Sequence, residues 1–291
     1  MIKQKLSRNA KKVDKFLINF IKKQKNSLLV KPMKYGVISG GKKIRSTIIF
    51  DMGRIFNLKE KNLINICAAV ECIHSYSLIH DDLPCMDNDS IRRGKPATHI
   101  KYGEASAVLA GSSLLTLAFE IIVDKSCLLN SRVKNEIIKS LSSCSGHTGI
   151  AGGQELDLKF EKKKKTLNQI IDMQKKKTGK LFNFCLYAVG TAANKSDKEK
   201  KLLSNLGEEI GLLFQFADDF LDNKGSKKIV GKPVKKDKKK GKSTLLNLMG
   251  EDKAYLYANN LKKKILLKLK KHGKKAKELI KTIEFILERK F

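Results

Sequence analysis

This chain of 291 residues has no tryptophan, only 4 prolines and far fewer carboxylates than cations. Its formal net charge of +32 suggests a nucleic-acid or anionic-membrane partner. The lysines are spread over most surface-like segments, however, and aromatic residues make up only 7%, so platforms for stacking bases are poor. We therefore interpret the excess charge as compositional drift of the kind that AT-biased codons produce. We expect neither nucleic acid nor a membrane as a partner.

The cysteines indicate neither a metal site nor a disulfide framework, because none belongs to a CxxC pair or a His-paired metal spacing. The six are Cys67, Cys72, Cys85, Cys127, Cys144 and Cys185. The apolar stretch of residues 16–21 is too short for a secretory signal. No run approaches the roughly 18 apolar residues of a membrane span. We expect reduced core thiols in a soluble cytoplasmic protein.

Scarce proline and helical spacing of apolar residues predict an all-α fold, with residues 1–291 as one domain. Residues 10–25 are predicted to form an amphipathic helix, and residues 60–82 a helix that leads into a cluster of aspartates. The other expected segments are a turn-rich link at 31–41, a helix opening at 40–45, a loop at 99–110 and closing helices at 251–291.

Four aspartates follow the predicted helix in the stretch ECIHSYSLIHDDLPCMDNDSIRRG (residues 71–94): Asp81, Asp82, Asp87 and Asp89. Carboxylates are unfavourable at a helix C-terminus unless a cation neutralises them. Oxygen ligands without clustered Cys or His favour Mg²⁺, which commonly bridges to substrate phosphates. The adjacent Arg92 and Arg93 supply donors that suit diphosphate oxygens. The stretch therefore predicts a diphosphate site.

A second acidic stretch follows about 130 residues later, in QFADDFLD. Its polar residues, at i, i+3, i+4 and i+7, are Gln215, Asp218, Asp219 and Asp222. On a helix this spacing places them on one face. Like charges one turn apart destabilise a bare helix, so three carboxylates on an otherwise apolar segment indicate a bound counter-ion.

The two motifs, DDxxxxD from Asp81 and DDxxD from Asp218, resemble in combination and order those of the trans-isoprenyl diphosphate synthase (polyprenyl synthetase) family. IHDDLPCMDND is most similar to the first motif of bacterial farnesyl diphosphate synthases. The resemblance spans Gly40 to Thr244. It implies an isoprenoid synthase-type helical bundle around a central cavity, a homodimer, and Mg²⁺-dependent head-to-tail condensation. The substrates would be isopentenyl diphosphate and dimethylallyl or geranyl diphosphate, and the product (2E,6E)-farnesyl diphosphate.

The resemblance also assigns roles to individual residues. It implies that isopentenyl diphosphate is bound by Lys42, Arg45, His74 and Arg93. It places Arg92, Lys177, Thr178, Gln215, Lys232 and Lys242 on the allylic diphosphate, with Lys177, Thr178 and Gln215 as catalytic residues. Roughly two or three Mg²⁺ ions would be held by Asp81, Asp82, Asp87, Asp218 and Asp222. Gln154 and Asp157, in the segment that matches GQxxD, would orient lysines.

Product length and substrate closure are also implied by the resemblance. Tyr76 and Ser77 lie about one turn before Asp81, where an aromatic ring would stop the growing chain at 15 carbons. Residues 223–244 are basic and punctuated by glycine, and would form a mobile lid over the allylic diphosphate. Ser112 stands where relatives commonly carry Asp, which leaves a supporting role there open.

Several alternatives stay open. A geranylgeranyl diphosphate synthase would use the same motifs and make a longer product. The His80-Asp81 pair is compatible with a metal phosphohydrolase, although further histidine ligands are missing. A terpene cyclase shares the fold but normally mixes Asn, Ser and Glu in its second motif. A nucleic-acid-binding protein would explain the charge and leave both aspartate motifs unexplained.

Overall fold

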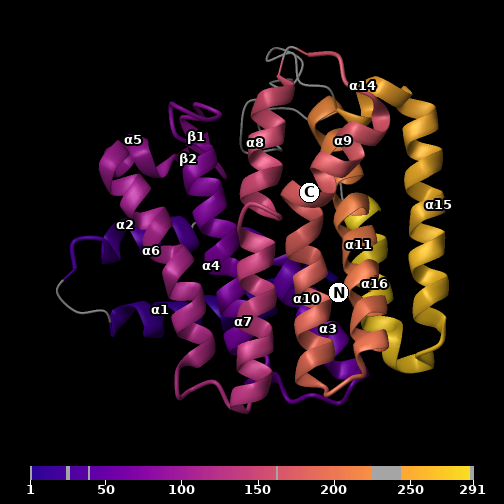
Figure 1. Ribbon diagram of the computed structural model, residues 1–291, viewed down its shortest axis with the longest axis horizontal. Coiled ribbons are helices and arrows are strands. Elements are labelled where there is room, and N and C mark those ends of the chain that lie inside the picture. The colour runs from indigo at the N-terminus through magenta and orange to yellow at the C-terminus, as the bar shows by residue number, and fades with distance from the viewer. Residues whose placement is uncertain (1, 24–26, 39, 162, 225–243, 289–291) are drawn as a thin grey trace.

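The computed structural model describes residues 2–23, 27–38, 40–161, 163–224 and 244–288, and their fold is all-α as predicted (Figure 1). The longer helices are α1 (Ile2–Lys22), α3 (Ile44–Ile55), α4 (Ile64–Asp81), α6 (Glu104–Val123), α7 (Ser131–Ser145), α8 (Ile150–Phe160), α10 (Lys180–Ala192), α11 (Asp197–Lys224), α15 (Glu251–Lys270) and α16 (Lys277–Glu288). The short elements are α2 (Val30–Val37), η1 (Glu60–Asn62), α5 (Thr98–Tyr102), α9 (Leu167–Gln174), the π-helical turn η2 (Lys175–Gly179), α14 (Leu245–Met249) and η3 (Gly273–Ala276). Strands β1 (Ile91–Arg92) and β2 (Lys95–Pro96) form a small hairpin.

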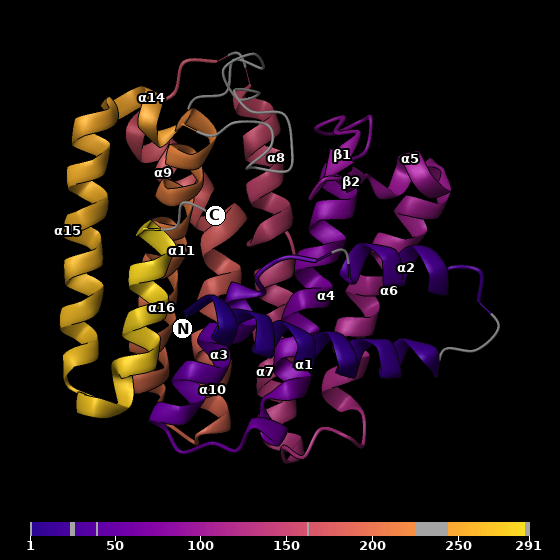
Figure 2. The same cartoon turned by 180° about the vertical axis from the view of Figure 1, so that it is seen from behind.

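Most long helices run up and down side by side, and α1 crosses them on the face that is toward the viewer in Figure 2. The hairpin that follows α4 and the helix α14 that follows α11 both lie at the upper end of the bundle in Figure 1. The two aspartate motifs are therefore at the same end, since each occupies the last turns of its helix or the loop after it.

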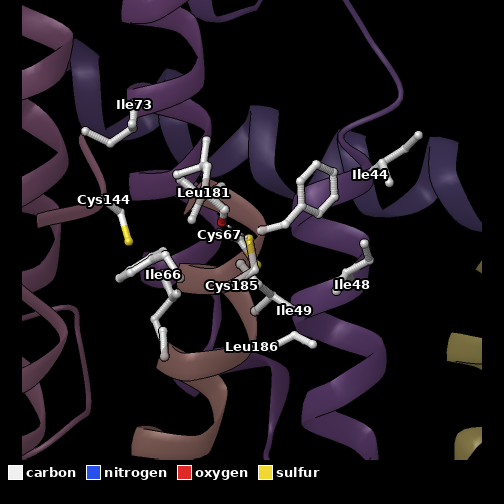
Figure 3. Close-up of a cluster of buried hydrophobic side chains, with 14 of the residues drawn as sticks. Ile44, Ile48, Ile49, Ile66, Cys67, Ile73, Cys144, Leu181, Cys185 and Leu186 are labelled. Atoms are coloured by element: carbon white, nitrogen blue, oxygen red, sulfur yellow. Dashed lines mark hydrogen bonds between the residues drawn. The ribbon is translucent and has the colours of Figure 1, made fainter. Parts of the chain in front are cut away.

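Helix α4 is the centre of the bundle. It is buried nearly all round, where it packs against α3, α6 and α10. Figure 3 shows part of this apolar core, with Ile49 of α3 close to Leu186 of α10 and Ile66 of α4 on the side of Cys144. Burial on all sides fixes the direction of α4, so the residues at its C-terminal end are held by a rigid support.

Three predictions of local secondary structure from the sequence were wrong. Residues 31–41 are not a turn-rich link, because α2 occupies most of them; Pro32 lies in its first turn, where its missing N–H costs nothing. Residues 99–110 are helical rather than a loop, and only Gly103, at φ +86°, separates α5 from α6. Helix α11 also continues past Asp222 to Lys224, into the segment expected to be a lid.

Two whole-chain expectations also need correction. Five cysteines are buried, but Cys85 is exposed in the loop after α4, so it is no core thiol. We expected no segment of the chain to be long and apolar enough to cross a membrane, but helix α6 is, by length and composition. Its serines, threonine and glycine hide this from a search for uninterrupted apolar residues. A core helix passes the same test, and one face of α6 packs against α4.

A buried ion pair ties the two ends of the chain together. Lys5 of α1 donates to Asp51 of α3 and to the hydroxyl of Thr282 of α16, each at 2.8 Å. The Asp51 side chain is fully buried, and Thr282 also donates to it at 2.6 Å. A buried carboxylate of this kind depends on its partners, because nothing else replaces its lost hydration.

We predict that Lys5→Met lowers the free energy of unfolding by about 3 kcal/mol, because it leaves the Asp51 charge buried without its ammonium partner. Urea denaturation measures the change. Lys11→Met, on the exposed face of the same helix, is the control and should shift stability by less than about 0.5 kcal/mol. Equal destabilisation by both variants would show that the ion pair is not the cause.

Candidate active site

The first aspartate motif begins at the end of α4, and its loop is fixed by backbone hydrogen bonds. The N–H of Asp87 donates to the carbonyl of Asp81 at 2.8 Å, and the N–H of Asp89 to that of Asp82 at 3.0 Å. Burial raises the pKa of the Asp81 carboxyl to about 6, although Lys177 opposes the rise; Asp87 adds to it. The charged form of Asp81 is thus costly in this position, and a cation bound there would stabilise it.

Asp82 is held differently from Asp81. Its carboxylate is 2% exposed and accepts hydrogen bonds from Arg92 Nε, at 2.9 and 3.2 Å, and from Arg92 Nη2. Burial raises the Asp82 pKa, and the arginine partly offsets this. Asp89 lies 3.7 Å from the same guanidinium. The structure therefore pairs two residues that the sequence assigned to different ligands, Asp82 to metal and Arg92 to substrate.

The hairpin places Arg93 beside the glycine loop that precedes α3. Arg93 and Gly94 form a two-residue turn with φ of +53° and +72°, as a tight hairpin requires. Arg93 Nη1 donates to the carbonyl of Gly40. Gly41 has φ +103°, a backbone conformation that favours glycine, and the Arg93 guanidinium carbon lies 2.7 Å from where its Cβ would be, so the two segments approach closely here.

Near this junction the structure brings Arg45, His74 and Arg93 within electrostatic range of one another. We call these three residues and Lys42, which follows Gly41 in the chain, the basic cluster. The Lys42 ammonium lies 5.7 Å from the ring centre of Phe285. Burial lowers the His74 pKa well below its ordinary value, and the nearby cations Arg45 and Arg93 lower it further. An imidazole in this position is neutral, and the cations around it form a site for an anion.

Arg45 lies deepest in the basic cluster. It is 9% exposed, and its guanidinium lies over the rings of Phe182 and Phe214, at 4.5 and 5.6 Å. Its buried Nε has no hydrogen-bond partner among the described residues. A buried N–H donor without a partner is costly, so a bound anion is the simplest way to satisfy it. Burial lowers the Arg45 pKa, while Glu71 and Asp218 oppose the change.

On the other side of the site, Lys177 and Thr178 lie in the π-helical turn η2. Lys177 Nζ forms a 2.7 Å ion pair with Asp157 of α8, as expected for a residue that orients a lysine. A Cβ at Gly153 would lie 2.2 Å from the backbone nitrogen of Lys177, so α8 contacts this turn directly. Gln154 does not share the role, since both ends of its buried amide lack a partner among the described residues.

In the second aspartate motif, Asp219 is occupied by hydrogen bonds within the protein. Thr178 Oγ1 donates to Gln215 at 3.1 Å, Gln215 Nε2 donates to Asp219 at 2.9 Å, and Asp219 accepts the N–H of Leu245 at 3.0 Å. This chain of bonds holds α14 against α11. Asp218 and Asp222 are only half-buried, so they are the members of the motif that a ligand can reach.

A metal ion would have to complete its ligands from substrate or water. In the part of the chain that the structure describes, no three His, Cys, Asp or Glu side chains form a ready metal cluster. Carboxylate oxygens on two helices, one of them with a raised pKa, nevertheless match the ligand chemistry of Mg²⁺. The donor set fits Mg²⁺ held jointly by protein and phosphate oxygens.

Tyr76, the residue predicted to limit chain length, lies in α4 five residues before Asp81. Tyr76 is 8% exposed, its hydroxyl donates to the carbonyl of Ser145 at 3.2 Å, and its ring packs edge-on against His80. Ser77 donates to the carbonyl of His74. Tyr76 is therefore held firmly by α7 as well as by its own helix.

Some predicted residues lie elsewhere. Lys232 and Lys242, with most of the expected lid, fall outside the described residues. Ser112 is exposed on α6. The sequence did not single out the rings of Phe182, Phe214 and Phe285, or Lys43 and Glu71, which are buried behind the basic cluster. Of these, only Glu71 has a visible signal, a carboxylate within an apolar helix.

Comparisons with known proteins agree with this geometry. A sequence profile of the polyprenyl synthetase family matches residues 26–284. The farnesyl diphosphate synthase of Escherichia coli (strain K12) is 41% identical over 238 residues, which cover 81% of this chain and 80% of that protein.

Two solved structures are similar over nearly the whole chain. An FPP/GFPP synthase from Zymomonas mobilis has a TM-score of 0.87 and 34% identity, covering 98% of each chain. A geranyltransferase from Helicobacter pylori, complexed with magnesium and isoprenyl diphosphate, has a TM-score of 0.82 and 31% identity, covering 98% of this chain and 96% of that one. From profile, sequence and fold together, the chain belongs to the polyprenyl synthetase family.

Proposed function

We propose that the protein is a farnesyl diphosphate synthase, a soluble cytoplasmic prenyltransferase that joins isopentenyl diphosphate to dimethylallyl or geranyl diphosphate. One observation supports this most directly: a single end of the bundle holds two aspartate motifs and, beside them, a buried basic cluster. Two diphosphates of different kinds need two such halves, one that binds through a metal and one that binds through cations alone.

Within this proposal Mg²⁺ would be held by Asp81, Asp87, Asp218 and Asp222. The bound ions would supply positive charge to the departing diphosphate. We assign Asp82 to a positioning role, because its oxygens already accept hydrogen bonds from Arg92. Arg92, fixed in this way, would present the rest of its guanidinium to the allylic diphosphate.

The residues of the chain then divide the work of the reaction. Lys177, oriented by Asp157, would neutralise charge on the leaving diphosphate as the allylic C–O bond breaks and the oxygen keeps the bonding electrons. The bonded pair Thr178 and Gln215 would hold that diphosphate in place. The basic cluster would hold isopentenyl diphosphate so that its alkene attacks the allylic carbon, and the released pyrophosphate would accept the proton that is lost.

The direct test uses labelled isopentenyl diphosphate with geranyl diphosphate, with Mg²⁺ and with EDTA. We expect a new carbon–carbon bond only with Mg²⁺. Release of phosphate or pyrophosphate without carbon–carbon bond formation would contradict the proposal.

We predict that Asp81→Asn lowers the condensation rate by about 10²–10³-fold, because it removes a charged oxygen that stabilises the leaving diphosphate. Initial rates at saturating substrates and Mg²⁺ measure the loss. Asp252→Asn, at an exposed aspartate of α15, is the control and should stay within about twofold. A wild-type rate for Asp81→Asn would exclude the assigned role.

We predict that Tyr76→Ala shifts the main product from 15 to 20 or more carbons, because it removes the ring that we propose stops the growing chain. Mass spectrometry of the products measures the shift. Tyr76→Phe keeps the ring and loses only the bond to Ser145, so it should retain the 15-carbon product. A wild-type product that is already 20 carbons long would favour a geranylgeranyl diphosphate synthase and remove Tyr76 as the stop.

We also propose that the protein is a homodimer that pairs through α6. The outward face of this helix holds exposed apolar residues at helical spacing, with Val108 at 42%, Leu109 at 53% and Val123 at 55% exposure. Ser112 stands where relatives commonly carry Asp and adds no charge to this face, so Glu120, which is also exposed on α6, is the charge nearest to Val123 on the helix. Exposed apolar side chains near both ends of one helix, on a family member that is expected to dimerise, are best covered by the same helix of a second copy.

We predict that Leu109→Glu converts the dimer to a monomer, because the charge would be buried at the interface without a partner. Light scattering after gel filtration gives the mass. Leu256→Glu, at 62% exposure on α15, serves as the matched control and should leave the dimer intact. If the wild type is monomeric, or the control dissociates and the test variant does not, α6 is not the interface.

A further inference from the structure

Lys43 occupies an unusual position at the start of α3. It immediately follows Lys42 of the basic cluster, yet its side chain is turned inward and is 3% exposed. Its backbone has φ +42° and ψ +53°, a left-handed conformation that is unfavourable for a residue with a side chain. The carbonyl of Lys43 still accepts the N–H of Thr47 at 3.0 Å. Such a conformation persists only where surrounding contacts fix it.

Three different helices supply those contacts. The Lys43 ammonium donates to the carbonyl of Val37, in α2, at 3.2 Å. It lies 3.2 Å from a carboxylate oxygen of Asp14, in α1, as an ion pair outside hydrogen-bond alignment. Glu71 of α4 lies 3.9 Å away, with its side chain 4% exposed.

Glu71 links this contact back to α3. Its other oxygen accepts a 2.7 Å hydrogen bond from the hydroxyl of Ser46. Burial lowers the pKa of Arg45, and the nearby charge of Glu71 raises it. Glu71 therefore interacts electrostatically with a residue of the basic cluster. Lys43 and Glu71 therefore hold the first turn of α3 from its inner side.

The residues on either side of Lys43 belong to the basic cluster. Lys42 comes directly before it and extends toward Phe285, and Arg45 comes two residues later and lies over Phe182. The carbonyl of Gly40 accepts the hydrogen bond from Arg93. Lys43 lies between Lys42 and Arg45 in the chain. Because its side chain is anchored, its contacts determine where the backbone of Lys42 and Arg45 lies.

We propose that Lys43 is a positioning residue for isopentenyl diphosphate: its ammonium, held by Asp14, Val37 and Glu71, fixes the first turn of α3 so that Lys42 and Arg45 converge on one diphosphate. This rests on the proposed function of the basic cluster. Lys43 does not contact the substrate, and the allylic half of the site does not depend on it.

The test is Lys43→Met, which keeps the length of the side chain and removes the charge. We expect the KM for isopentenyl diphosphate to rise about tenfold or more, the size typical of losing a group that orients a ligand residue. The KM for geranyl diphosphate should stay within about twofold, because the allylic half is built on α4, η2 and α11. Lys43→Arg, which keeps the charge, should recover most of the affinity.

Lys200→Met is the matched control. Lys200 is also nearly buried, at 9% exposure, and pairs with two carboxylates, Glu136 at 2.6 Å and Asp197 at 2.8 Å, away from the basic cluster. Its loss should lower the melting temperature and leave the KM for isopentenyl diphosphate unchanged. If Lys43→Met does not fold, Glu71→Gln replaces it with the same expected division between the two KM values.

Calorimetric binding of isopentenyl diphosphate in EDTA separates this proposal from the proposed function. If the wild type binds isopentenyl diphosphate in EDTA but forms no product when Mg²⁺ and geranyl diphosphate are added, the proposed function is overturned. The positioning role is then judged on binding alone, which Lys43→Met must weaken about tenfold. Equal binding by wild type and Lys43→Met would overturn the positioning role, as would an equal rise in both KM values. No binding by the wild type would overturn both.

Discussion

The structure depends on how one end of a helical bundle compensates carboxylates that are crowded and partly buried. Asp81 ends α4, where the helix dipole and burial both disfavour its charge, and its pKa rises to about 6. Burial also raises the pKa of the neighbouring Asp82, but its pairing with Arg92 partly offsets the rise. The two neighbouring aspartates are thus stabilised differently: Asp82 by Arg92 of the protein itself, and Asp81 by a cation that would have to be bound. This difference separates positioning from metal binding within a single motif.

In the basic cluster it is cations, rather than carboxylates, that lie close together. Arg45 is buried against two aromatic rings, and its Nε has no hydrogen-bond partner among the described residues. Burial, and then the surrounding cations, lower the His74 pKa and favour its neutral form. Cations held at close range in a low-dielectric site repel one another, so their position has to be fixed from behind. Glu71, buried at 3% exposure beneath them, and the glycine loop interlocked with Arg93 supply that support. An incoming diphosphate would then meet a site already arranged for it.

Much of this could be predicted from the sequence, because it follows from local spacing. Apolar periodicity gave the helices, and the two aspartate motifs gave the end of the bundle where the site lies. The resemblance also predicted that Asp157 orients a lysine, and the structure identifies that lysine as Lys177. Spacing predicted the wrong structure for residues 31–41, where proline and glycine indicate turns but Pro32 sits harmlessly in a first helical turn.

The remaining features depend on contacts between distant segments. No local pattern shows that Arg92 faces Asp82, that Asp219 accepts the N–H of Leu245, or that the lysine next to Lys42 turns inward. The π-helical turn at Lys177 is equally hidden, because it arises where α8 approaches at Gly153. Residue types and spacing identify which chemistry is present, whereas tertiary packing decides which of two neighbouring charged residues performs it.

The central claim is that the two diphosphates are bound by different means, and equilibrium binding tests it most directly. Isopentenyl diphosphate and geranyl diphosphate would each be titrated alone into the wild-type protein, once with Mg²⁺ and once with EDTA. We predict that isopentenyl diphosphate binds with similar affinity in both conditions, whereas geranyl diphosphate binds tightly only with Mg²⁺. Binding of geranyl diphosphate that is unaffected by EDTA, or a Mg²⁺ requirement for isopentenyl diphosphate, would contradict the account.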